Sequence, residues 1–347
     1  MKSFDEIFVD KTKYGVKVQT TEYGEVGEHI IIDQGQSQIA GYTDRQEGLF
    51  EEVPVVIFGD HTRVIKYVDE PFFLGADGVK VLRSKDDNAN YKYLYYALKN
   101  ARIPDTGYNR HFKWLKEVQI NYPDSDKQAE IVDILDNVSS VIKKREDELC
   151  VLDDLIKARF VEMFGDPVSN SYGLPEATLP ELGEFGRGIS KHRPRNDPKL
   201  LGGGYPLIQT GDVANAGLYI TSYNSTYSEL GLRQSKMWKK GTLCITIAAN
   251  IAKTAILTFD ACFPDSVVGF TANEKTNNIF IHYWFLFFQT ILESQAPESA
   301  QKNINLKILS ELRVIVPKKE KQDEFVDFIH QVDKSKVVVQ KALDETQ

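Results

Sequence analysis

The sequence predicts an α+β protein in which two domains of mixed strands and helices are separated by two long helices. Three observations predict this fold class. One segment repeats far along the chain, two long helical segments carry matching apolar seams, and each half contains strand-like runs punctuated by Gly and Asp. At 347 residues, two domains are also the natural expectation.

The repeat has an offset of 194 residues. The pattern L-x-E-V-x-I-x-x-P-x-x-x-K-Q-x-E-I-V-D at 115–133 returns as L-x-E-L-x-V-x-x-P-x-x-x-K-Q-x-E-F-V-D at 309–327. A period this long indicates a duplicated domain and helix, because solenoid repeats are much shorter. Each half should therefore be a separate domain that ends in a long helix.

The elements of the first domain follow from short apolar runs. Strands are expected at 29–32, 54–58 and 79–82, which are rich in Ile, Val and Phe. Residues 91–99 place apolar side chains at helical spacing and predict a helix. Weaker echoes of these segments occur in the second half in the same order, which supports the duplication.

A helix is expected from Ser125 to Phe164, where Gly165-Asp166-Pro167 ends it. Its apolar residues alternate in steps of four and three, and the second helix repeats the same steps. The seam residues expected to pair the helices are Ile131, Leu135, Val138, Ile142, Leu149, Leu152 and Ile156 in the first, and Phe325, Ile329, Val332, Val339 and Leu343 in the second. The alternative is that each helix packs only on its own domain. The seam cations Arg145, Arg159 and Lys336 either fix the register or extend to solvent.

Composition limits the class of protein. No apolar run approaches the roughly 20 residues of a membrane helix, and no secretory signal is visible, so no membrane is expected as a partner. Three cysteines form no disulfide or zinc pattern, which favours a reducing, cytoplasmic location. Adenine-methylase, phosphate-loop, dinucleotide and zinc-protease motifs are missing, so the sequence predicts no catalytic residues, no metal ligands and no enzyme.

The charge distribution points to nucleic acid more than the net charge of −8 does. Between Arg187 and Lys253 there are ten Lys or Arg residues against three Asp or Glu residues. Such a cluster can neutralise phosphates, although a solvated basic face without a partner is the alternative. The acidic residues gather instead on the two long helices, which suits a solvated face or a surface that meets protein.

Base edges are recognised by Arg, Lys, Asn and Gln on loops, because their donors and acceptors match those of the bases. Polar loops of this kind occur in both halves, although ordinary surface turns look similar. The candidate DNA-contacting residues are Gln34, Gln36, Arg45, His61, Arg63, Asn109 and Arg110 in the first domain, and Arg187, Lys191, Arg193, Arg195, Gln209, Lys239, Asn250, Lys253, Lys302 and Asn303 in the second. Substituting Arg193 or Lys253 should weaken DNA binding and its dependence on salt.

The phrase LIKARFVEMFGDP at 155–167 closes the first long helix. It closely resembles the central conserved region of type I restriction-modification specificity subunits, and the resemblance extends over the whole chain. It implies target recognition domains at 1–124 and 167–317, a central conserved helix at 125–166 and a distal conserved helix at 318–347. The two helices would pair antiparallel, and each domain would recognise one half of an asymmetric, bipartite site in double-stranded DNA.

The same resemblance implies the partners. Two modification subunits, which methylate adenine, would dock on the helices, and restriction subunits would complete the enzyme. S-adenosylmethionine, ATP and Mg²⁺ would bind those partners, and this chain would bind no cofactor. By the repeat offset, Gln347 corresponds to Asp153, so the distal helix is some 11 residues shorter than the central one. The alternative function is a coiled-coil interaction protein whose flanking domains bind protein or glycan.

Overall fold

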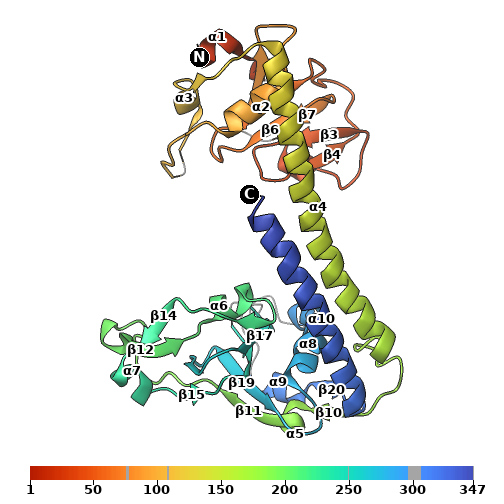
Figure 1. Ribbon diagram of the computed structural model, residues 1–347, viewed down its shortest axis with the longest axis vertical. Helices are drawn as coiled ribbons and strands as arrows, with labels where there is room; N and C mark the ends of the chain where they lie inside the picture. The colour runs from red at the N-terminus through yellow and green to blue at the C-terminus, as the bar shows by residue number, and fades with distance from the viewer. Residues whose placement is uncertain (76–77, 108, 249, 296–305, 347) are drawn as a thin grey trace. The chain divides into compact units, whose positions relative to one another are not determined.

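The computed structural model describes residues 1–75, 78–107, 109–248, 250–295 and 306–346. The chain divides into two compact units, Met1–Lys143 and Lys144–Glu345. Both mix short helices with β-sheets (Figure 1). None of the helices within the described ranges is long and apolar enough to span a lipid bilayer.

Two sheets form the first unit. One has the strand order β2-β8-β5-β6 with antiparallel neighbours, and the other has the order β4-β3-β7, in which β3 and β7 are parallel. The strands are β2 (Phe8–Asp10), β3 (His29–Ile32), β4 (Gly41–Thr43), β5 (Val55–Gly59), β6 (Ile65–Val68), β7 (Phe72–Leu74) and β8 (Val79–Ser84). A short pair, β1 (Lys2–Ser3) and β9 (Gln119–Ile120), joins the two ends of the domain.

Strand β5 is buried on both faces because it separates two apolar cores. Val56 and Phe58 pack in a core with helix α2 (Tyr91–Lys99), and Val55 and Ile57 pack in another with strand β7. Alternate residues of a strand point to opposite faces, so one strand supplies both cores. The predicted strands and the predicted helix at 91–99 are confirmed. Short helices α1 (Phe4–Ile7) and α3 (Phe112–Leu115) close the ends of the first core.

The second unit contains a sheet of order β11-β19-β16-β17-β13 and another of order β14-β12-β18-β15. The strands are β11 (Gly183–Arg187), β12 (Leu201–Leu207), β13 (Tyr219–Ile220), β14 (Ser225–Tyr227), β15 (Met237–Trp238), β16 (Leu243–Thr246), β17 (Thr254–Leu257), β18 (Ala261–Cys262) and β19 (Val267–Ala272). The helices are α5 (Leu179–Leu182), α6 (Thr210–Asn215), α7 (Glu229–Arg233), α8 (Asn278–Gln295) and α9 (Leu306–Glu311), and strand β10 (Glu176–Thr178) pairs with β20 (Arg313–Ile315).

The two units share one topology, which confirms the predicted duplication. The order β2-β8-β5-β6 matches β11-β19-β16-β17, and the parallel pair β3–β7 matches β12–β18. Small details repeat as well. The buried amide of Gln128 donates to the Pro123 carbonyl oxygen at 2.8 Å, and that of Gln322 donates to the Pro317 carbonyl oxygen at 2.9 Å. These bonds fix the start of each long helix.

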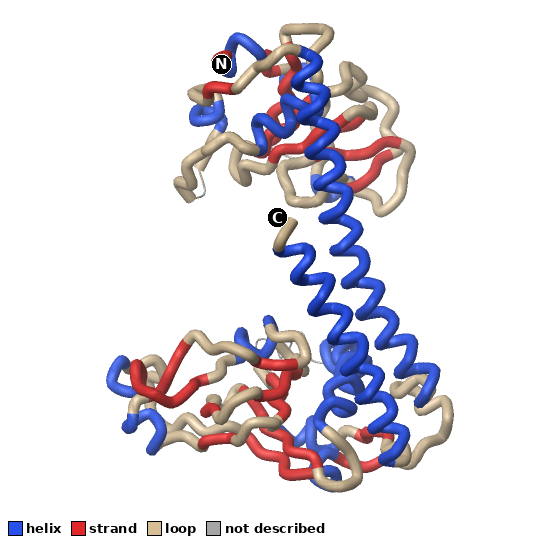
Figure 2. The backbone as a smooth tube through the Cα atoms, viewed as in Figure 1, coloured by secondary structure: helices blue, strands red, loops and turns tan. Residues whose placement is uncertain are grey.

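The predicted long helices are α4 (Ser125–Phe164) and α10 (Lys319–Asp344). Within the second unit they lie side by side and run antiparallel, as the tube view shows (Figure 2). Arg159 forms an ion pair with Glu324 at 3.3 Å, and Lys336 forms one with Asp153. These two seam cations therefore connect the helices. Arg145 instead pairs with Glu148 one turn along its own helix.

The seam residues occupy different surroundings along the helices. In the second unit, Ile156 shares one apolar core with Phe325, Ile329 and Val332, and Leu152 packs at its edge. Val339 and Leu343 are buried, and Leu149 is half-buried.

In the first unit, the seam of α4 begins on the domain itself. Ile131 packs against the core beside α2, because the helix starts on that domain. Leu135 and Ile142 are half-buried, and Val138 is 36% exposed. Pairing of Ile131, Leu135, Val138 and Ile142 with a partner helix stays a prediction.

Candidate nucleic-acid interface

Three loops of the first unit are joined by hydrogen bonds into one platform: residues 33–38 after β3, 60–63 between β5 and β6, and 103–107 with 109–111 before α3. The Gln34 side-chain oxygen accepts a hydrogen bond from the His61 backbone N–H at 3.1 Å. The Thr62 hydroxyl donates to the Gln34 carbonyl oxygen at 2.6 Å. The predicted residues Gln34 and His61 thus lie together, and both help to hold the loops.

A buried aspartate and histidine connect the second loop to the third. The His111 backbone N–H donates to the Asp60 carbonyl oxygen at 2.8 Å, and a carboxylate oxygen of Asp60 accepts from the Phe112 N–H at 2.8 Å. The His111 Nδ1 also lies 3.1 Å from the Asp60 carbonyl oxygen. Both side chains are buried, so these bonds are protected from competition with water.

Arg63 and Lys66 also hold the loops of the platform together. The Arg63 guanidinium donates to the Asp105 carboxylate at 2.7 Å and to the Ile103 carbonyl oxygen at 3.4 Å. Lys66 is only 2% exposed, and its ammonium donates to the Ser37 carbonyl oxygen at 2.6 Å. Burial lowers the pKa of Lys66, because removal from water disfavours the charged form. The platform therefore has a rigid base.

Two predicted residues project from this platform. Gln36 and Arg110 are exposed, and within the part of the chain that the structure describes their side chains have no partner. Asn109 donates to the Thr106 carbonyl oxygen. Arg45 lies apart from these bonds and pairs with Glu22 at 3.7 Å, where both side chains are exposed. Gln36 and Arg110 are thus the side chains most available to a ligand.

Three predicted arginines of the second unit converge on Asp265. The Arg195 guanidinium lies 2.5 Å from its carboxylate and that of Arg193 lies 3.4 Å away, while Arg187 donates to its backbone carbonyl oxygen. Three guanidinium groups against one carboxylate leave this arginine cluster positive. Arg193 is also held by the Ser190 and His192 carbonyl oxygens, at 2.6 and 2.8 Å.

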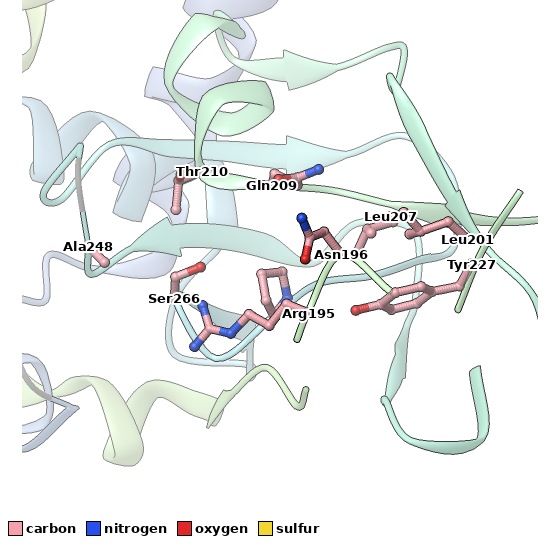
Figure 3. Close-up of a pocket in the computed structure, with 10 residues that line it drawn as sticks. Arg195, Asn196, Leu201, Leu207, Gln209, Thr210, Tyr227, Ala248 and Ser266 are labelled. Carbon is pink, nitrogen blue, oxygen red and sulfur yellow. The ribbon is translucent and has the colours of Figure 1, made fainter. Parts of the chain in front are cut away.

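Beside this arginine cluster lies a pocket of about 350 Å³ (Figure 3). It is lined by Arg195, Asn196, Leu201, Leu207, Gln209, Thr210, Tyr227, Ala248, Pro264 and Ser266. Gln209 follows β12 as Gln34 follows β3, and Ala248 lies in the β16–β17 turn, the counterpart of the β5–β6 turn. Equivalent loops therefore meet in both units.

The other predicted residues of this unit are placed differently. Lys191 and Asn250 are exposed, and Lys239 pairs with Asp260 at 2.8 Å. The half-buried Lys253 ammonium donates to the Gln289 side chain of α8 at 3.0 Å, so it braces the β16–β17 turn. Lys302 and Asn303 lie outside the described residues. Within those residues, His, Cys, Asp and Glu form no group of three that could hold a metal ion.

Comparison with known proteins decides the family. The sequence model described as the type I restriction modification DNA specificity domain matches residues 9–150 and again 176–345, one match in each half of the chain. The chain belongs to the type I restriction-modification DNA specificity family. Its mixed fold, with two such domains split by a long helix, agrees with the expected fold class.

Two relatives and one solved structure illustrate the membership. The EcoR124I/EcoR124II specificity subunit of Escherichia coli is 30% identical over 151 residues, which is 40% of this chain and 37% of the relative. The MjaX specificity subunit of Methanocaldococcus jannaschii is 21% identical over 88% of this chain and 70% of its own length. The crystal structure of the S subunit from M. genitalium matches 99% of this chain and 92% of that chain, with 16% identity and a TM-score of 0.58.

Several residues that shape the site of this specificity-family member were not found from the sequence. Asp265 lies 78 positions from Arg187, and nothing near it marks it as the centre of the arginine cluster. No sequence pattern around Lys66 predicts its burial. The Asp60–His111 contact spans 51 positions. The aromatic wall of the pocket, Tyr227, had no motif around it. Only tertiary contacts bring these side chains to the site.

Proposed function

We propose that this chain is the DNA-recognition subunit of a type I restriction-modification complex, and that its two domains each recognise one half of a bipartite, asymmetric site. The observation that carries the proposal is the duplication of the loop arrangement. In the first unit the loop after β3 meets the β5–β6 turn, and in the second unit the loop after β12 meets the β16–β17 turn. Each of these loops and turns carries Gln, Asn or Arg. Two similar recognition surfaces in one chain suit a site with two different halves.

Recognition divides between phosphate and base contacts. Arg187, Lys191, Arg193 and Arg195 contact phosphates in the second unit. The three guanidinium groups are already engaged by Asp265 and by backbone carbonyl oxygens, so they offer positive charge rather than a free pair of donors for a base edge. Gln36 and Arg110 contact base edges in the first unit, since their amide and guanidinium groups match adenine and guanine. Gln34, His61 and Arg63 position them. The remaining members of the proposed contact set are Asn109, Gln209, Asn250, Arg45, Lys239, Lys302 and Asn303.

The helices α4 and α10 act as the spacer and the docking surface. Their faces expose the apolar side chains Val151, Leu155, Val337 and Val338, which a protein partner can cover. Two modification subunits that carry S-adenosylmethionine and methylate adenine dock here, and restriction subunits that use ATP and Mg²⁺ join them. This chain contributes recognition and no catalytic residue. We place the domain boundaries at 124, 166 and 317, close to the limits of α4 and to the start of α10.

The proposal is tested by mapping adenine methylation in a methylation-free host that expresses this chain with its modification subunit. A methylated two-part motif with a fixed gap is the expected result. A host expressing the modification subunit alone is the control. Absence of new methylation, despite a purified stable complex, would reject the proposal and favour an interaction protein whose domains bind protein or glycan.

A further inference from the structure

The pocket beside the arginine cluster holds a buried tyrosine whose hydroxyl lacks a partner. Tyr227 is 2% exposed, and its hydroxyl makes no hydrogen bond with any described residue. Figure 3 shows the hydroxyl directed toward the side of the pocket where Asn196 and Arg195 lie. The hydroxyl oxygen is not among the buried polar atoms without a partner in the described residues, so it is the part of Tyr227 that solvent reaches. A ligand in the pocket can therefore form a hydrogen bond with this hydroxyl.

Other polar groups of the same pocket are also unused. Among the described residues, the Asn196 amide and the Thr210 and Ser266 hydroxyls have no hydrogen-bond partner. The Gln209 amide has one long hydrogen bond, at 3.4 Å, to Ser225. Amides and hydroxyls both donate and accept, so this pocket offers both kinds of group to a ligand. A nucleobase edge presents the same mixture.

The shape and charge of the pocket further limit the chemical class of ligand that it can bind. The pocket volume of about 350 Å³ lies at the lower end for small-molecule sites and exceeds what one inorganic phosphate would fill. Leu207, Pro264 and the Tyr227 ring provide apolar wall, which suits the face of a planar heterocycle. Arg195 supplies a cation, and it shares the Asp265 carboxylate with Arg193, so positive charge remains for a phosphate.

We propose that this pocket binds a single nucleotide, with the base against Tyr227, Asn196 and Gln209 and the phosphate at Arg195. The inference rests on the proposed function in one respect: DNA is then the natural source of the nucleotide. Extraction of a base into a protein pocket costs a few kcal/mol, which the unused donors and acceptors offset. A free nucleotide offers the same chemistry, and the experiment separates the two sources.

The first arm measures binding of free nucleotides. The full-length chain, in complex with its modification subunit, is titrated by calorimetry with dAMP, dGMP, dCMP, dTMP and inorganic phosphate. At least one nucleotide should bind, and Tyr227→Phe and Asn196→Ala should each weaken it about fivefold to tenfold, as expected for one lost hydrogen bond. Inorganic phosphate at the same concentration should not displace the bound nucleotide from the pocket. Tyr223→Phe, at an exposed tyrosine of the same unit, is the matched control.

The second arm maps methylation directed by the same variants. If the nucleotide comes from DNA, Tyr227→Phe relaxes or abolishes one position of the methylated motif while Tyr223→Phe leaves the motif unchanged. If the nucleotide is free, Tyr227→Phe weakens only the calorimetric binding. The phenylalanine keeps the ring that packs in the core, and an unchanged thermal unfolding midpoint verifies the fold.

Two outcomes would overturn the nucleotide site. One is that Tyr227→Phe and Asn196→Ala change neither nucleotide binding nor the motif. The other is that inorganic phosphate competes as well as the nucleotides, which would indicate a simple anion site at Arg195. In either case a two-part motif from the unaltered chain would leave the DNA-recognition function standing. Nucleotide binding without any directed methylation would reject that function and keep the pocket.

Discussion

At the scale of single residues, His282 of α8 shows how burial controls ionisation. Burial lowers the pKa of His282 to about 4, and its Nδ1 lies 2.9 Å from the Thr254 hydroxyl. An unfolded chain protonates this group near pH 6.5, so the unfolded state binds more protons between those values. The free energy of unfolding should therefore fall as the pH decreases through this window, by about 3 kcal/mol in total.

His282→Asn keeps a hydrogen-bonding group near Thr254 and removes the titration. Urea unfolding of this variant between pH 4 and pH 7 should show a weaker loss of stability in acid than the unaltered chain does. The control is His330→Asn, because His330 is exposed on α10. Identical acid profiles for His282→Asn and the unaltered chain would show that another group controls acid sensitivity.

A second prediction at the scale of single residues concerns the contribution of Arg193 to DNA affinity. Arg193→Ala removes one cation from the arginine cluster, so affinity should decrease for all sequences and the salt slope of binding should fall by about one. Binding to duplex DNA is measured across a salt series with the complex of this chain and its modification subunit. The control Lys341→Ala removes one exposed charge from α10. Equal slopes for both variants would remove Arg193 from the phosphate contacts.

The same residues show where prediction from sequence ends. The basic segment was visible as a charge pattern, but the role of each cation was not. Lys253 has the same charge as Lys191, yet it donates to Gln289 of α8 while Lys191 is exposed. Arg63 was predicted to contact DNA, and the structure shows that its guanidinium braces residues 103–105. Such roles depend on partners distant in sequence, which local pattern does not encode.

At the scale of elements, the sequence pattern predicted helices and strands more completely than it predicted the roles of single residues. The apolar periodicity and the helix-ending segment Gly165-Asp166-Pro167 together predicted α4 from Ser125 to Phe164. This works because apolar residues recur every three or four positions along the buried face of a long helix. Strand β12 was not predicted. It runs from Leu201 to Leu207 and contains three consecutive glycines, which are unfavourable in strands on local grounds. The pairing of β12 with β14 shifts register between Leu201 and Tyr205, so the glycines lie at this irregularity while Tyr205 to Leu207 form the regular pairs.

The paired helices give the element-scale prediction. Ile156 of α4 is 1% exposed in the core that it shares with Phe325 and Ile329, whereas Val151 on the same helix is 65% exposed. Ile156→Asp buries an unpaired charge and should lower the free energy of unfolding by about 3 kcal/mol or more. Val151→Asp should change it by less than about 0.5 kcal/mol. Denaturant unfolding and copurification with the modification subunit measure both effects.

The outcome for the exposed position also tests docking. If Val151→Asp folds normally but no longer copurifies with the modification subunit, the exposed valine lies in the docking surface. A stable Ile156→Asp variant that still directs normal methylation would contradict the paired-helix spacer.

At the scale of the whole molecule, the proposed spacer makes the gap between half-sites a function of helix length. Four helix-forming residues inserted between Lys143 and Lys144, at the boundary of the two units along the chain, lengthen α4 by about 6 Å. Because base pairs rise about 3.4 Å each, the methylated motif should keep both half-sites and gain one or two base pairs of gap. The control replaces the exposed Lys143, Lys144, Glu146 and Asp147 by alanine, which keeps the length and should keep the gap. Methylation mapping reads both results, and an unchanged gap in an active insertion variant would mean that α4 does not set the spacing.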